Sequence, residues 1–299
     1  MAFQAGTPRD AASAESAQAS EIERLERGAL VTFAPCPFAV PHGEEHAFLC
    51  SQRLRGMRRE CISYDPRQNR AHGFVRQSAA HAERLRDVLA GSADRATHWL
   101  AAMLPRYAAG WELARVAFHP AEEATRRLRP AQRNDLLHID AAPLRSTYGR
   151  RTLRLFVNLH PTDPRVWLTS LPFAELLQNY GAEVGLPVSS AAPWRGLLRL
   201  FQPRRPPAAA LYKDFRQRLR DYLMQHDGFQ ERAPKKCWHF PPGTAWLTFT
   251  DGISHAELRG RFVLEFTFFI APESLACPEL APRILFERAG GLVGSSQAA

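Results

Sequence analysis

The chain has 299 residues, enough for one large domain or two small ones, and its hydrophobic fraction of 45% is that of an ordinary globular protein. No apolar run approaches the ~20 residues that cross a bilayer, and the polar beginning is unlike a secretory signal, so we expect a cytoplasmic protein. A net charge of +9 favours an anionic partner such as nucleic acid, a membrane surface or a charged glycolipid. The five cysteines show no CxxC spacing, which argues against a disulfide framework or zinc ribbon and for reduced thiols.

The first part of the chain predicts a tail followed by helices. Residues 1–18 are rich in Ala, Ser and Gln and are expected to be disordered. The region from His42 to Arg70 has no regular pattern. From Ser78 to Gly110 apolar residues recur at helical spacing, and Gly91-Ser92 predicts a break into two helices that pack against a sheet. Ala121 to Leu128 predicts another helix.

The stretch LLHIDAAPLRSTYGRRTLRLFVNL carries a His-x-Asp pair, His138 and Asp140. Side chains alternate along an extended strand, so these two share a face and Ile139 points into the opposite layer. His255, far downstream, follows a predicted strand and an Asp-Gly turn and is the best third ligand. Two histidines and one carboxylate leave coordination positions open, which suits a non-haem ferrous ion that activates oxygen.

Two predicted strands carry arginines on a polar inner face. One runs from Arg151 to Leu159 and the other begins near Arg261. An arginine that faces inward is costly to bury unless an anion meets it, so Arg154 and Arg261 are candidate clamps for an acidic small molecule, with Asn158 as a further donor. The alternative is that either arginine only pairs with Glu265 or lies exposed at an edge.

Helices are predicted after the first half of the strands. Phe173 to Tyr180 predicts a helix that ends at Gly181, and Leu211 to His226 predicts an amphipathic one. Between them, residues 194–205 place Trp and Phe on one side and arginines on the other, which fits either a helix in a membrane interface or one packed on the core.

The phrases LLHIDAAPLRSTYGRRTLRLFVNLHPTDPRVW and FPPGTAWLTFTDGISHAELRGRFVLEFTFF resemble the Kdo 3-hydroxylases of Gram-negative bacteria, within the iron and 2-oxoglutarate oxygenases. The resemblance implies an α+β fold with a double-stranded β-helix (jelly-roll, cupin-like) core, N-terminal helices and a helical insert at about 171–235. One oxygenase domain would span 19–292, followed by a mobile tail at 293–299. It implies hydroxylation of the Kdo sugar on lipid A to Ko, in the inner core of lipopolysaccharide.

Carried over residue by residue, the resemblance makes His138, Asp140 and His255 the Fe(2+) ligands. The co-substrates would be 2-oxoglutarate and O2, with ascorbate in support. Arg154 lies fourteen residues after Asp140, as in members that clamp 2-oxoglutarate from that strand, whereas Arg261 follows His255 by only six. Arg154 is therefore the first candidate and Arg261 the second.

The predicted substrate contacts are Arg145, Tyr148 and Arg165, on loops beside the motif. The expected partners are a Kdo-bearing lipid A precursor and, peripherally, the anionic cytoplasmic face of the inner membrane, with no nucleic acid and no obligate protein partner. Two alternatives stay open. One is a 2-oxoglutarate oxygenase that acts on protein or nucleic acid, and the other is a non-catalytic barrel that binds acidic sugars.

Overall fold

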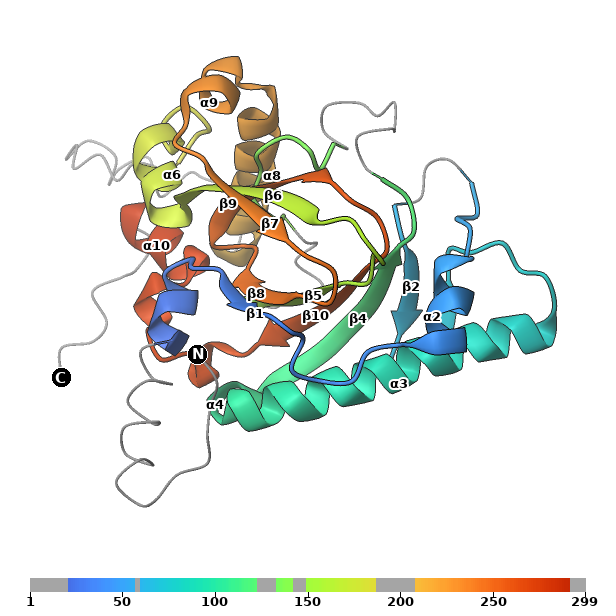
Figure 1. The fold of residues 1–299 in the computed structure, drawn as a ribbon. Coiled ribbons are helices and arrows are strands. Elements are labelled where there is room, and N and C mark those ends of the chain that lie inside the picture. The colour runs from blue at the N-terminus through green and yellow to red at the C-terminus, as the bar shows by residue number, and fades with distance from the viewer. Residues whose placement is uncertain (1–20, 57–59, 123–132, 142–148, 187–207, 291–299) are drawn as a thin grey trace, which may run out of the picture.

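The computed structural model describes residues 21–56, 60–122, 133–141, 149–186 and 208–290, and two antiparallel sheets dominate them (Figure 1). The larger sheet has seven strands in the order β1-β8-β5-β10-β4-β2-β3. In that order their bounds are Val31–Phe33, Ala245–Phe249, Arg151–Asn158, Val263–Ile270, Trp111–His119, Ile62–Asp65 and Arg70–His72. β5 and β10 pair over their full length at the centre, from Arg151 opposite Ile270 to Asn158 opposite Val263.

The smaller sheet has the order β7-β6-β9, with bounds Lys236–Phe240, Arg165–Pro172 and Ile253–Arg259. It packs on the β8, β5 and β10 part of the larger sheet through an aromatic cluster. Trp246 stacks on Phe240 at 4.0 Å between ring centroids, and Trp167 meets Phe156 edge-on at 4.7 Å. Two facing antiparallel sheets with helices outside them confirm the predicted α+β class.

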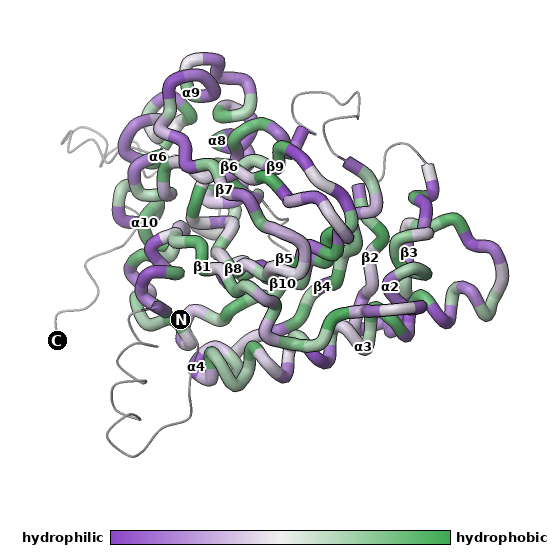
Figure 2. Tube along the Cα trace, in the orientation of Figure 1, coloured by the Kyte–Doolittle hydropathy of each residue, from purple (hydrophilic) through white to green (hydrophobic). Residues whose placement is uncertain are grey.

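The outer face of the larger sheet is covered by α3 (Ala79–Met103), with α2 (Gly43–Cys50) and α4 (Pro105–Ala108) at its ends. Hydrophobic and hydrophilic stretches alternate along α3 (Figure 2), as a helix with one buried face requires. The predicted break at Gly91-Ser92 is wrong, because α3 is continuous. Leu89, Ala93 and Ala96 carry the buried stripe past that point, and the packing outweighs the ~1 kcal/mol that a helical glycine costs.

A second group of helices gathers at the far side of the smaller sheet: α6 (Phe173–Tyr180), α8 (Ala208–Gln225), α9 (Asp227–Arg232) and α10 (Pro282–Ala289). Two short 3-10 turns, Pro272–Ser274 and Pro278–Leu280, precede α10. The predicted helices from Phe173 to Tyr180 and from Leu211 to His226 are confirmed as α6 and α8. They share a hydrophobic cluster with Leu137 and Ile139, the neighbours of the His-x-Asp pair.

The alternation predicted for the central strands is confirmed. Leu155 and Phe266 face the core under α3, whereas Arg154 and Glu265 face the interior between the sheets. The strand predicted to begin near Arg261 is β10, which starts two residues later, at Val263. The region from His42 to Arg70 is also more regular than expected, since it contains α2, β2 and the start of β3.

Several predictions lie outside the described residues. They are the tail at 1–18, most of the helix from Ala121 to Leu128, the basic stretch at 194–205 and the tail at 293–299. Among the helices of the described ranges, none has the length and apolar character that crossing a membrane demands.

Candidate metal centre

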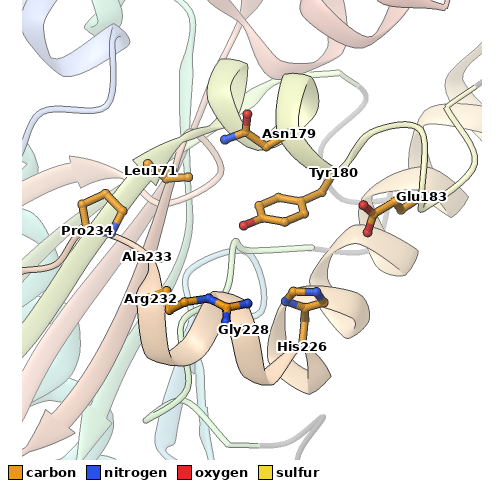
Figure 3. A pocket seen from close by; sticks show the side chains of 9 residues that line it. All are labelled: Leu171, Asn179, Tyr180, Glu183, His226, Gly228, Arg232, Ala233 and Pro234. Atoms are coloured by element: carbon orange, nitrogen blue, oxygen red, sulfur yellow. The ribbon is translucent and has the colours of Figure 1, made fainter.

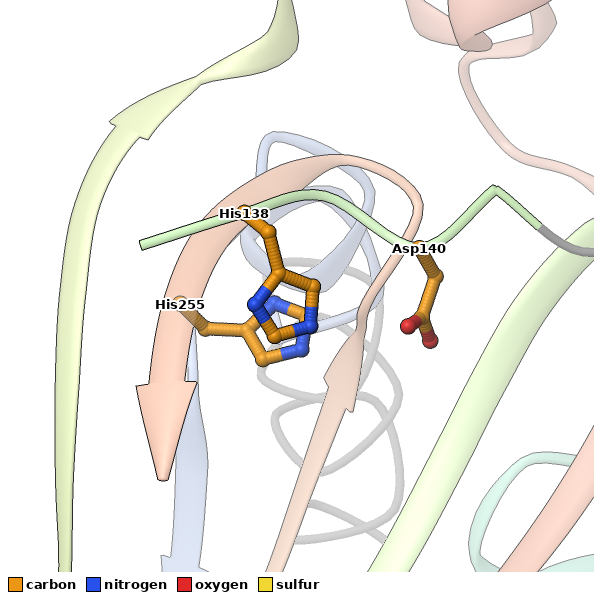
Figure 4. Close-up of side chains that lie close together, drawn as sticks. All are labelled: His138, Asp140 and His255. Atoms are coloured by element: carbon orange, nitrogen blue, oxygen red, sulfur yellow. The ribbon is translucent and has the colours of Figure 1, made fainter. Parts of the chain in front are cut away.

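His138, Asp140 and His255 come together in the interior, although more than a hundred residues separate the first pair from the last (Figure 4). One ligand atom from each residue lies within 4.8 Å of the others, and all three side chains are buried. This is the two-histidine, one-carboxylate set that the sequence predicted.

Backbone pairing places the triad. His138 and His255 form an antiparallel bridge, with nitrogen-to-oxygen distances of 3.0 and 2.8 Å, and the Asp140 amide donates to the Thr250 carbonyl at 3.1 Å. From the other side, Arg216 on α8 donates to the Asp140 carbonyl at 2.7 Å. The strand-like segment is thus fixed between β9 and α8, and Ile139 lies in the opposite layer as predicted.

Each histidine is oriented by a carbonyl next to it in the chain. His138 Nδ1 lies 2.8 Å from the Leu136 oxygen, and His255 Nδ1 lies 3.0 Å from the Ile253 oxygen. A carbonyl can only accept, so Nδ1 carries the hydrogen in both rings, and Nε2 is the atom that a neutral ring offers to an ion. Burial, and then the neighbouring His255, lower the pKa of His138 well below its usual value, so this ring is neutral.

The carboxylate of Asp140 is ready to bind a cation. Burial raises its pKa, but Arg154 and the two histidines outweigh burial and bring the pKa below its ordinary value. Arg154 Nη2 lies 2.9 Å from Asp140 Oδ2, yet that oxygen is buried and receives no well-aligned hydrogen bond. A buried oxygen without a hydrogen bond beside two free Nε2 atoms fits a divalent ion such as Fe(2+).

A chain of charged groups leads outward from the triad along the larger sheet. Arg154 also lies 3.3 Å from Glu265, which in turn binds Arg115 at 2.9 Å and His119 at 2.9 Å. Burial raises the pKa of Glu265, but the two arginines hold it well below its usual value. The Nε of Arg154 is buried without a hydrogen-bond acceptor, so this guanidinium has donor capacity left for a carboxylate.

The other predicted co-substrate residues lie differently. Asn158 donates its amide to the Asp163 and Phe240 carbonyls and accepts from the His160 amide, so its polar atoms hold a turn. Arg261 is exposed before β10, and its contacts within the described residues are to His160 and Phe262 rather than to the triad. A role for Asn158 and Arg261 in binding 2-oxoglutarate stays a prediction. The contacts of both residues point away from such a role.

Of the predicted substrate contacts, Arg145 and Tyr148 lie outside the described residues. The placement of Arg165 on a loop is wrong. It is the first residue of β6, is buried, and binds the Glu257 carboxylate and the Gly260 carbonyl. A buried arginine needs such partners, and they occupy the guanidinium that was expected to meet substrate.

Arg115, which contacts Glu265 beside the site, was not among the residues predicted from the sequence. A signal for Arg115 is present in the sequence, because side chains alternate along β4. One face carries Arg115, Ala117 and His119, and the other carries Val116 and Phe118, so the strand has a polar face like that of β5. The arginine of α8 that binds the Asp140 carbonyl left no such signal, because it lies in an ordinary amphipathic helix.

A cavity of about 430 Å³ lies between α6 and α9, away from the triad (Figure 3). Tyr180, His226 and Arg232 are among the residues that line it, and none of its lining residues is a candidate metal ligand. This cavity is therefore separate from the candidate metal centre.

The chain matches the family model of the 3-deoxy-D-manno-oct-2-ulosonic acid (Kdo) hydroxylases over residues 8–292. It is also similar to crystal structures of the Kdo hydroxylase KdoO, a non-haem Fe(II) α-ketoglutarate (2-oxoglutarate) dependent dioxygenase. The KdoO complex with cobalt(II) has a TM-score of 0.79 and 30% identity, with 95% of this chain and 94% of that chain covered. The complex with α-ketoglutarate and Fe(III) has a TM-score of 0.76 and 31% identity, with 92% and 90% covered. The complex with succinate and Fe(III) has a TM-score of 0.77 and 30% identity, with 95% and 94% covered.

No curated protein sequence matches the chain significantly. The structural similarity confirms the jelly-roll fold, and the family match confirms the resemblance seen in the two sequence phrases. The chain belongs to the Kdo hydroxylase family and is a non-haem Fe(II)- and 2-oxoglutarate-dependent dioxygenase.

Proposed function

We propose that the protein hydroxylates the Kdo sugar of a Kdo-bearing lipid A precursor and so converts Kdo to Ko in the inner core of lipopolysaccharide. The observation that carries the proposal is the buried His138, Asp140 and His255 cluster in a chain that matches the Kdo hydroxylase family. Ascorbate in support, the cytoplasmic location and a peripheral contact with the inner membrane remain part of the same proposal.

The protein's own contribution is positioning. The three side chains would hold Fe(2+) through the two Nε2 atoms and Oδ2 of Asp140, and the ion would supply oxygen activation. Arg154 is the proposed clamp for the distal carboxylate of 2-oxoglutarate, because its buried Nε has no acceptor in the described structure. The carboxylate of Glu265, 3.3 Å from Arg154 Nη1, fixes the position of the same guanidinium.

Aromatic side chains pack against one side of the metal site. Trp167 stacks on the His255 ring at 5.3 Å, and Trp246 lies edge-on to Trp167 at 5.7 Å. Apolar surroundings lower the local dielectric constant and so strengthen the interaction between Arg154 and a bound carboxylate. Arg145 and Tyr148, just after the His-x-Asp pair, remain proposed contacts to the sugar.

The test is incubation of the Fe(2+)-loaded protein with air, 2-oxoglutarate and a Kdo-bearing lipid A precursor, followed by mass spectrometry of the lipid. The proposal predicts a gain of one oxygen on the Kdo portion that depends on 2-oxoglutarate. Succinate formed with an unchanged lipid would retain the oxygenase and reject this substrate. Oxidation of a protein or nucleic acid instead would support the alternative oxygenase, and absence of both products would overturn the proposed reaction.

A further inference from the structure

The segment that carries the candidate ligands His138 and Asp140 has backbone partners on one edge. His138 pairs with His255 of β9 through both its amide and its carbonyl. Peptide groups alternate in direction along an extended chain, so the amide and carbonyl of Leu137 point to the opposite edge. In the described part of the chain, no backbone group bonds to Leu137 there. Leu137 is 1% exposed, and buried peptide groups need partners, so this edge depends on side chains.

Gln230 of α9 supplies those partners. Its Oε1 accepts from the Leu137 amide at 2.9 Å, and its Nε2 donates to the Leu137 carbonyl, also at 2.9 Å. A carboxamide offers the same donor and acceptor as a peptide group, so Gln230 takes the place of a neighbouring strand. Nε2 also donates to the Leu223 carbonyl in the last turn of α8, at 2.8 Å. The side chain thus joins both helices to the residue before His138.

Two arginines of α8 extend this contact along the segment. Arg216 and Arg220 lie one helical turn apart, on the same face of α8. Nη2 of Arg216 donates to the Asp140 carbonyl at 2.7 Å, and Nη1 of Arg220 lies 3.5 Å from the Ile139 carbonyl. Arg216 is 3% exposed, and a guanidinium buried to this extent needs a fixed acceptor, which the Asp140 carbonyl provides.

The apolar side chains of the segment are held by the same two helices. Leu137 and Ile139 belong to one hydrophobic cluster with Phe215 and Leu219 of α8 and Phe229 of α9. Hydrogen bonds therefore fix the backbone of the segment while packing fixes the side chains that point away from the metal centre.

We propose that Gln230, with Arg216, is a positioning residue for the metal centre, and that its bonds to Leu137 set the direction of the His138 and Asp140 side chains. This inference rests on the proposed function, through the assignment of those two residues as metal ligands. A turn of the Leu137 peptide groups is passed along the backbone to the next residue and so moves the His138 ring. Partners that orient metal ligands typically contribute about 10- to 100-fold to metal affinity.

Gln230→Met tests the proposal, because methionine has a similar length and makes none of the three hydrogen bonds. Titration of the metal-free protein with cobalt(II), followed by absorption, should give a Kd about tenfold or more above that of wild type. Gln217→Met is the matched control. Gln217 is an exposed glutamine of α8 that donates to Asp221 in the same helix at 3.0 Å, so its replacement should leave the Kd unchanged.

Hydrogen exchange followed by mass spectrometry separates positioning from a general loss of stability. In Gln230→Met, the peptide that contains Leu137 should exchange faster, because the Leu137 amide loses its acceptor, while a peptide from the centre of β5 exchanges as in wild type. Arg216 gives a second, independent test. Arg216→Lys keeps a donor for the Asp140 carbonyl and should bind cobalt(II) more tightly than Arg216→Met.

A Kd for Gln230→Met equal to that of wild type would overturn the proposal and leave the metal centre in place. A raised Kd with faster exchange in β5 as well would assign the effect to stability and likewise reject the positioning role. Cobalt(II) binding that survives in His138→Ala would reject the metal centre and the positioning role together. The expected Kd and exchange results in a protein that leaves Kdo unchanged would support the positioning role and reject only the proposed substrate.

Discussion

Replacing Glu265 with glutamine should destabilise the metal-free protein strongly. The carboxylate is 1% exposed and accepts from Arg115, His119 and Thr267, with Arg154 also within 3.3 Å. Glu265→Gln keeps the shape but removes the charge that faces two arginines, the largely buried Arg154 and the half-exposed Arg115. Removing one partner from a buried ion pair costs about 3–5 kcal/mol. Because glutamine can keep part of the hydrogen bonds that Glu265 makes, we expect the free energy of unfolding to fall by about 3 kcal/mol, the lower value.

Glu112→Gln is the control because Glu112 also binds two arginines, Arg67 at 2.6 Å and Arg150 at 2.7 Å. Its side chain is 24% exposed and Arg67 is 72% exposed, so this change should cost only about 0–1 kcal/mol. Thermal unfolding followed by circular dichroism at neutral pH should show a Tm lower by about 5 °C for Glu265→Gln and by less than about 2 °C for Glu112→Gln. Equal shifts in the two variants would refute the argument from burial.

Three further results are expected. Arg154→Ala should raise the KM for 2-oxoglutarate by about tenfold or more in steady-state kinetics, and an unchanged KM would remove Arg154 from the clamp. Burial raises the pKa of the Cys61 thiol to about 11, so mass spectrometry after brief alkylation at pH 7.5 should find exposed Cys237 modified and Cys61 intact. The pKa of Glu265 is lowered on folding, so its stabilisation is present above the unfolded value and is lost as the pH falls below about 4.5. Wild type should therefore lose Tm more steeply than Glu265→Gln in that range, and parallel curves would contradict the linkage.

The triad could be predicted because its signal is local. Strand alternation alone puts His138 and Asp140 on one face with Ile139 behind them, and the structure has that arrangement. His255 was found by its place after a strand and a turn. The positions of Arg154 and Glu265 on the interior face also follow from alternation along β5 and β10.

The rest depended on contacts between distant parts of the chain. Gly91 predicts a helix break by its propensity, but packing of the flanking residues under the large sheet keeps α3 continuous. The burial of Arg165 could not be predicted, because its partner Glu257 is remote in sequence. Arg115 contacts Glu265 only because β4 pairs with β10, and these two strands are far apart in the sequence.

The most direct test of the account is titration of the metal-free protein with cobalt(II), a probe stable in air, followed by absorption and by metal analysis after gel filtration. We expect one ion per wild-type chain, and loss of that ion in His138→Ala, Asp140→Ala and His255→Ala with the far-ultraviolet circular dichroism unchanged. His226→Ala, which alters the unrelated cavity between α6 and α9, should bind cobalt(II) like wild type. Tight, stoichiometric binding that survives in all three triad variants would contradict the assignment of the metal centre.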